Sequence, residues 1–210
     1  MRITYNAPVV LTFTLVCTII TLLDTTIFGL ANVTAVANAP ERPGGLATWL
    51  FTVYPFGTAE MNTWNPLMYF RLFSHAMGHA GWGHLVGNFT FILLLGPILE
   101  EKYGSRPLLF MIFVTALITG ILNATMFRNP LLGASGIVFM MIILSSYTNA
   151  KQSTIPLSFI LVACLFLGKE IYNAMFTVDG ISQFAHIIGG IAGGLFGYVI
   201  SSKEAVVTKK

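Results

Sequence analysis

The sequence carries too little charge to cover a surface that faces water. Of its 210 residues only 9% are charged and 55% are hydrophobic, whereas ordinary soluble domains carry roughly a quarter charged residues. A domain in water needs a far more charged exterior than this chain can build. The composition therefore predicts an integral membrane protein in contact with the lipid bilayer.

The sequence also has few cysteines, no repeat at a solenoid period and a small net charge. The two cysteines, Cys17 and Cys164, both lie inside apolar segments, which excludes a disulfide framework. No repeat recurs at a solenoid period. The formal net charge of +3 is small and scattered, so nothing indicates a nucleic-acid partner.

Long apolar segments dominate the rest of the chain. Each is about 17–24 residues long, enough to cross the hydrocarbon core as a helix. One long connection, residues 32–81, is aromatic and amphipathic and is predicted to lie against the bilayer face. The sequence thus predicts an all-α bundle of six transmembrane helices in a single domain over 1–210, with spans at about 8–31, 82–103, 107–127, 133–149, 155–175 and 184–201.

Basic residues set the orientation of this bundle. If the N-terminus lies inside, the outer side holds only Arg42, Arg71 and Arg128, and both termini are cytoplasmic. The inner side then collects Arg2, Lys102, Arg106, Lys151, Lys203, Lys209 and Lys210. A cleaved signal peptide ending at "ANA", residues 37–39, is the competing interpretation, but its apolar run is too long and the site too far downstream.

Four polar side chains fall at similar depth on three of the predicted spans. With this topology His84, Asn88, Ser135 and His186 all lie in the outer half of the membrane. Polar groups in hydrocarbon are costly and usually face a bundle interior or a water-filled cavity. The cluster is therefore the candidate functional site.

Ser135 lies between Ala134 and Gly136, two residues after Gly133, and two interpretations of it stay open. A membrane serine can bond a carbonyl one turn back and serve helix packing, and a lone Gly-x-Ser-Gly is a weak motif. A nucleophilic serine instead needs an adjacent base. His186 lies on a span whose glycines, Gly189 and Gly193 among them, allow another helix to approach closely. If that helix is the fourth span, Gly133 and Gly136 on either side of the serine are expected to take part in the same packing.

These residues carry a resemblance to a known family. The chain contains "GHLVGNF" on the second span, "GASGIVF" on the fourth and "AHIIGGIAGG" on the sixth. This set, in this order, resembles the signature of the rhomboid intramembrane serine proteases of the bacterial six-span type, over residues 69–201. The resemblance implies the bacterial inner membrane as location, Ser135 as nucleophile and His186 as general base.

The resemblance also implies further roles. His84 and Asn88 help to form the oxyanion hole, as the backbone N–H of Ser135 can. Position 139 commonly holds a tyrosine that stacks on the catalytic histidine, and here it is Phe139, which keeps the ring without the hydroxyl. The frequent Trp-Arg pair of the long loop reads Phe70-Arg71, and Glu100 matches an acidic residue for which a structural ion pair is expected.

Other polar residues receive no chemical role. His75 and His79 are four residues apart, but Ala76 stands where a zinc protease would have its glutamate, so a structural, hydrogen-bonding role is favoured over a metal site. Asp24 is expected to bond Thr25 or Thr26 or to face a polar pocket. Two further charged residues, Lys169 and Glu170, are expected to pair or to extend toward the interface.

The predicted activity is hydrolysis of peptide bonds in transmembrane segments of membrane-protein substrates by a Ser-His dyad, without metal or cofactor. In the family, substrate is thought to enter beside the fifth span, under a loop that is here 177–183 with Ile181 as cap. A catalytically inactive relative that binds membrane helices is the main alternative. A small transporter is less consistent, because the chain shows no paired broken helices.

Overall fold

The computed structural model describes residues 4–27, 45–147, 157–162, 164, 165, 168 and 183–207, with side chains described up to residue 199. Several predictions lie outside these residues. They are the end of the first span, the outer-side residue Arg42, most of the fifth span with Lys169 and Glu170, the loop that contains Ile181, the inner-side residues Arg2, Lys151, Lys209 and Lys210, and the side chain of Lys203.

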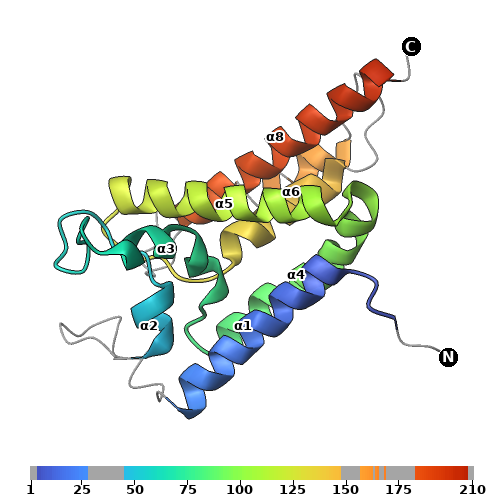
Figure 1. Ribbon diagram of the computed structural model, residues 1–210. Coiled ribbons are helices and arrows are strands. Elements are labelled where there is room, and N and C mark those ends of the chain that lie inside the picture. Colours follow the sequence, from blue (N-terminus) through green and yellow to red (C-terminus); the bar gives the residue numbers. More distant parts are fainter. Residues whose placement is uncertain are drawn as a thin grey trace.

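All described elements are helices, which confirms the all-α prediction. In order they are α1 Pro8–Thr26, α2 Leu46–Phe51, α3 Pro66–Ser74, the 3₁₀ turn η2 His75–Met77, α4 Trp82–Tyr103, α5 Ser105–Met126, α6 Ser135–Tyr147 and α8 Gln183–Val207. Figure 1 shows α1 and α4 side by side, with α2 and α3 together at one end of the molecule.

Three of these helices, α1, α4 and α5, are long and apolar enough to cross a membrane, and α6 and the first part of α8 are shorter apolar helices. Large apolar side chains point outward from the long helices, for example Leu94 at 63% exposure and Phe110 at 62%. Water would not tolerate so much exposed apolar surface, whereas lipid does. The chain is an integral membrane protein.

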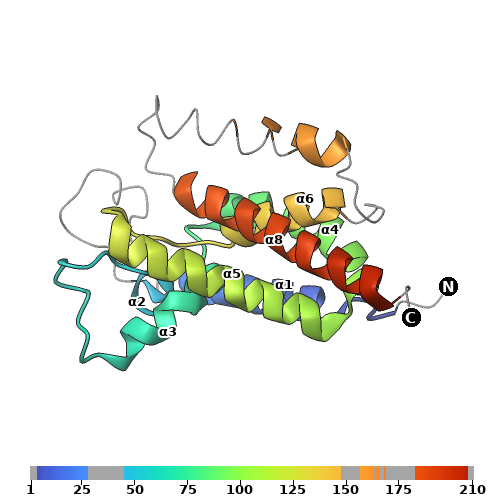
Figure 2. The same cartoon turned by 90° about the horizontal axis from the view of Figure 1, so that it is seen from above.

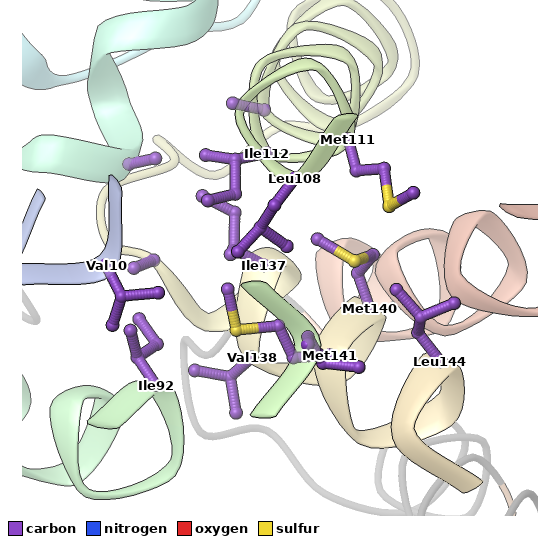
Figure 3. Packing of buried hydrophobic residues seen from close by; sticks show 14 of the residues in the cluster. Val10, Ile92, Leu108, Met111, Ile112, Ile137, Val138, Met140, Met141 and Leu144 are labelled. Atoms are coloured by element: carbon purple, nitrogen blue, oxygen red, sulfur yellow. The ribbon is translucent and has the colours of Figure 1, made fainter. Parts of the chain in front are cut away.

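Helix α6 lies at the centre of the bundle. Every residue from Gly136 to Leu144 is buried, so the helix is covered on all sides. Its side chains pack with Val10 of α1, Ile92 of α4 and Leu108 of α5 in one apolar cluster (Figure 3). Its most extensive partner is α8, and the two helices lie next to each other in Figure 2. This central position fixes the start of α6 relative to three neighbouring helices.

Helix α6 is shorter at its N-terminal end than the predicted span 133–149, because it begins at Ser135. Gly133 has φ +116°, which is not a helical conformation, so α6 cannot extend toward the N-terminus through this residue. The segment before it is extended and pairs with Val53 through two backbone hydrogen bonds to Leu131, of 3.0 and 2.9 Å. The sequence pattern predicts Gly133 inside the helix, because a glycine among apolar residues has the same pattern in a membrane span as in a buried turn.

The long connection folds into α2, α3 and η2, elements that the sequence analysis did not anticipate. Arg71 of α3 is buried, and its guanidinium donates to the Trp49 carbonyl near the end of α2, with Nε at 2.9 Å, while it lies over the Tyr54 ring. Ser74 Oγ donates to the Leu50 carbonyl at 3.2 Å. Trp64 is 93% exposed. Helix α3 also packs on α5, so the connection has some side chains that pack inward and others, such as Trp64, that stay exposed.

Two buried carboxylates join distant parts of the chain by capping helices. Asp24 of α1 accepts the N–H of Ala47, in the first turn of α2, at 3.1 Å. Thr25 and Thr26, the partners first expected for Asp24, instead donate to carbonyls of their own helix. A carboxylate at a helix N-terminus satisfies free N–H groups and the positive end of the helix dipole.

Glu100 of α4 plays the same part at the start of α1. Its two carboxylate oxygens accept the N–H groups of Val9 and Val10 at 2.9 and 3.0 Å. The sequence predicted a structural ion pair for Glu100. Within the described residues its contacts are these two backbone amides, so the structural role is helix capping.

Candidate active site

The serine lies at the first turn of α6. Ala134 O accepts the N–H of Val138, so the helical hydrogen bonds begin at Ala134, and Ser135 is the first residue of the helix. The N–H groups of the first helical turn have no carbonyl one turn before them. The backbone at Ser135 therefore presents donors at the positive end of a helix dipole.

The turn before Ser135 is held by the long connection. Gly133 N–H donates to the His75 carbonyl of η2 at 2.9 Å, next to the pairing of Leu131 with Val53. Asn123 Nδ2 donates to the Asn129 carbonyl at 2.9 Å and closes the other side of the turn. The half-buried Ser135 is thus placed by backbone contacts that reach far along the chain.

Two polar side chains of α4 face this turn. A Cβ atom on Gly133 would lie 2.7 Å from His84 Nε2 and 3.7 Å from Asn88 Nδ2. His84 and Asn88 are four residues apart and share a helix face, as the sequence predicted. Only a glycine fits at position 133, because the residue needs both the positive φ and the space that these side chains occupy.

Each of these α4 side chains presents a donor toward Gly133. Asn88 is buried, and its Nδ2 has no acceptor within the described part of the chain. His84 Nδ1 accepts the N–H of Ala80 at 3.3 Å, which leaves Nε2 on the side of Gly133. A buried amide donor without an acceptor costs free energy, so an acceptor placed beside Gly133 would gain a hydrogen bond from Asn88.

Helices α6 and α8 meet backbone to backbone. A Cβ atom on Gly189 would overlap the carbonyl of Gly136, and one on Gly193 would overlap the carbonyl of Met140. A Cβ on Gly136 would lie 3.2 Å from the Ala185 carbonyl. The glycines on both helices therefore permit the close approach that small residues allow between membrane helices.

This approach brings His186 onto the face of α6 that carries the serine. The rings of Phe139 and His186 stack with centroids 4.4 Å apart and planes 4° apart. Phe139 follows Ser135 by four residues, so the two side chains share one face of α6. The serine, both histidines and Asn88 thus converge around the first turn of α6.

The remaining histidines support this site from the long connection. His75 Nε2 lies 3.2 Å from the Ala116 carbonyl of α5, and the His79 ring packs edge-on against His84 with centroids 5.2 Å apart. Burial lowers the pKa of His75 and of His79 to about 3, so both rings are neutral near pH 7. Within the described residues no three potential ligands gather as a metal site would require.

Sequence reasoning missed two contributors to the site. They are the N–H of Ala80, which bonds His84, and the carbonyl of His75, which bonds Gly133. Both are backbone groups, which every residue carries, so no residue pattern signals them.

The fold and the site define a helical membrane protein with a serine at a central helix N-terminus, a histidine on the adjoining helix and two donor side chains on a third. Residues 66–203 match the rhomboid domain, and the chain belongs to the rhomboid family.

Curated relatives agree with this assignment. Rhomboid protease GlpG of Haemophilus influenzae is 25% identical over 134 residues, which cover 62% of this chain and 69% of the relative. Rhomboid-related protein 1 of Caenorhabditis elegans is 33% identical over 62% of this chain and 39% of its own length. Rhomboid protease GluP of Bacillus subtilis is 30% identical over 69% of this chain and 28% of its own length. The chain thus matches well under half the length of the last two relatives.

Proposed function

We propose that this protein is an intramembrane serine endopeptidase that cleaves transmembrane segments of other membrane proteins. The observation that carries the proposal is the stack of His186 on Phe139, one turn along α6 from Ser135. It supports a Ser-His dyad, because it places an imidazole beside the face that carries the hydroxyl. The relatives named as rhomboid proteases support the same activity.

The proposed mechanism is acyl transfer in two halves. His186 takes the Ser135 proton as the serine oxygen bonds to the substrate carbonyl carbon, and the carbonyl oxygen becomes an oxyanion. His84, Asn88 and the Ser135 N–H donate to that oxyanion. Collapse breaks the C–N bond, and His186 gives its proton to the leaving amine. Water, deprotonated by His186, then hydrolyses the acyl-enzyme and restores Ser135.

The position of the site within the bundle restricts the substrate. A transmembrane helix has all its carbonyls in hydrogen bonds, so it must unwind locally before the serine can attack one. Residues with low helix propensity lower the free energy needed to unwind a helix, relative to alanine, by about 1 kcal/mol for glycine and about 3 kcal/mol for proline. We therefore propose substrates that carry such residues near the cleaved bond.

The proposed topology has six spans with both termini in the cytoplasm of a bacterial cell and the site open toward the outer side. The basic residues of the inner loops support this orientation. Cysteine labelling from either side of the membrane tests it. A cysteine placed at exposed Thr63 should react with an impermeant reagent from outside, and one at Glu101 should react only after permeabilisation.

A fluorophosphonate that labels activated serines tests the activity itself. The detergent-solubilised protein should be labelled at Ser135. Ser135→Ala should lose labelling and cleavage of a reporter membrane helix, and His186→Ala should lose both while it stays folded. Ser145→Ala is the matched control, because Ser145 lies on the same helix and donates to the Ile142 carbonyl. It should keep full labelling.

Cleavage by purified Ser135→Ala would overturn the proposal. The alternative, a catalytically inactive rhomboid-like binder, predicts a different outcome. In that case the wild-type protein would retain membrane helices in a pull-down but would show neither labelling nor cleavage.

A further inference from the structure

The turn between η2 and α4 touches one of the proposed oxyanion donors. Ala80 precedes α4, and its backbone N–H donates to His84 Nδ1 across 3.3 Å. Gly81, which follows, has φ +142° and is the N-cap of α4. The backbone before α4 therefore places one N–H donor against the ring of His84.

This contact determines where the ring proton lies. A neutral imidazole carries one N–H, and its other nitrogen is an acceptor. Because Ala80 is a donor, His84 Nδ1 must be the acceptor, and the proton lies on Nε2. In the other tautomer two N–H groups would face each other, and the partly buried hydrogen bond from Ala80 would be lost.

The nitrogen that keeps the proton is the one that faces the serine turn. His84 Nε2 lies 2.7 Å from the position of a Cβ on Gly133, on the side of Asn88 Nδ2. The edge-on ring of His79 packs against His84 from another side and itself contacts Phe89. The His84 ring is thus fixed in orientation as well as in tautomer.

We propose that the Ala80 N–H is a positioning group that holds His84 as the Nε2–H tautomer and so aims a hydrogen-bond donor at the turn before Ser135. The inference rests on the proposed function for its catalytic consequence, because only an Nε2–H can donate to an oxyanion. The wrong tautomer would present a lone pair to that oxyanion and would repel it.

Histidine nitrogen NMR tests the tautomer without any assay of activity. The chain has only four histidines, so the spectrum of ¹⁵N-histidine-labelled protein contains few signals, and loss of one set in His84→Gln assigns His84. In the wild-type protein at neutral pH the His84 signals should show a protonated Nε2 and an unprotonated Nδ1. A His84 ring protonated at Nδ1 alone would overturn the proposal.

Removal of the donor tests its cause. Ala80→Pro lacks the N–H, and Ala80→Gly retains it as the matched control. In Ala80→Pro the His84 signals should shift toward a mixture of the two tautomers. The value of kcat should fall about 10- to 100-fold, while KM stays within about twofold of the wild-type value. This fall in kcat is smaller than the 10²–10³-fold fall, roughly, that follows complete loss of an oxyanion donor. Ala80→Gly should keep the wild-type tautomer.

If Ala80→Pro does not fold, a third variant tests the same hydrogen bond. Lactic acid at position 80 replaces the amide by an ester and deletes the N–H without restricting φ. An unchanged His84 tautomer in a folded protein that lacks this N–H would overturn the proposal. Failure of the proposed function is distinguishable, because it appears as cleavage by Ser135→Ala and leaves the tautomer unaffected.

Discussion

Gly189 of α8 touches the backbone of α6 at Gly136, so closely that a Cβ on Gly189 would overlap the Gly136 carbonyl. Gly136 follows the candidate nucleophile, and Gly189 follows the candidate base by three residues. The contact therefore sets the distance between the two helices at the point where Ser135 and His186 have to meet. The residues that make it have no functional groups, yet they decide whether the site exists.

Gly189→Ala should damage both stability and activity. The added methyl meets backbone atoms, which cannot rotate away, so the helices must separate. Overpacking of this kind typically destabilises by about 1–3 kcal/mol. Thermal unfolding in detergent and fluorophosphonate labelling measure the two effects. Gly194→Ala is the matched control, because its Cβ would meet nothing closer than 3.8 Å and should leave both readings near the wild type. Equal behaviour of the two variants would contradict the backbone contact.

Asn88→Ala should lose activity without losing stability. The buried Asn88 Nδ2 has no acceptor in the described part of the chain, so its removal breaks no hydrogen bond there. Loss of one oxyanion donor typically lowers kcat by about 10²–10³. Kinetics on a reporter membrane helix, together with a melting curve, separate the two effects. Thr90→Ala, on the exposed side of α4, serves as control. Full activity in folded Asn88→Ala would remove Asn88 from the mechanism.

Phe139→Leu should slow the reaction by up to about tenfold, because a stacked aromatic pair contributes about 0.5–1.5 kcal/mol beyond its buried area. Leucine retains apolar bulk but gives His186 no ring to stack on. Phe139→Tyr retains the ring and should keep wild-type kcat. The values of kcat for the two variants and the wild-type protein check the prediction. If Phe139→Leu had the same kcat as the wild-type protein, the stack would not orient the base.

Glu100→Gln should lower stability while activity per folded molecule is kept. A glutamine side chain has one carbonyl oxygen in place of the two carboxylate oxygens that accept from Val9 and Val10. A buried N–H left without its acceptor costs about 1–3 kcal/mol. The melting temperature of the purified protein reports the loss. The neighbouring Glu101 is exposed, so Glu101→Gln should melt as the wild type. Wild-type melting of Glu100→Gln would show that the cap contributes nothing.

Some features of the fold were accessible from the sequence because they depend on local pattern. The bounds of α4, Trp82–Tyr103, agree with the predicted span 82–103, since an apolar run and flanking glycines mark both ends. The pairing of His84 with Asn88 on one face follows from helical periodicity alone. The catalytic roles of Ser135, His186, His84 and Asn88 stay predictions, because placement alone does not measure a reaction.

Other features depend on contacts between residues far apart in the chain. Glu100 binds amides 91 and 90 positions away, and Asp24 binds one 23 positions away. Such partners are backbone N–H groups, which no residue type marks. For this reason the sequence predicts an ion pair for Glu100, and local hydroxyl partners or a polar pocket for Asp24.

The membrane environment of this protein, its helical class and its family follow from the sequence alone, because composition, apolar run length and short motifs are properties of neighbouring residues. The first residue of α6 and the orientation of the His84 ring depend instead on contacts in the folded protein. The start of α6 follows from the positive φ of Gly133 and its bond to the His75 carbonyl, and the His84 ring follows from the Ala80 N–H. Backbone donors and acceptors are identical in every residue, so their partners are set by packing and not by composition.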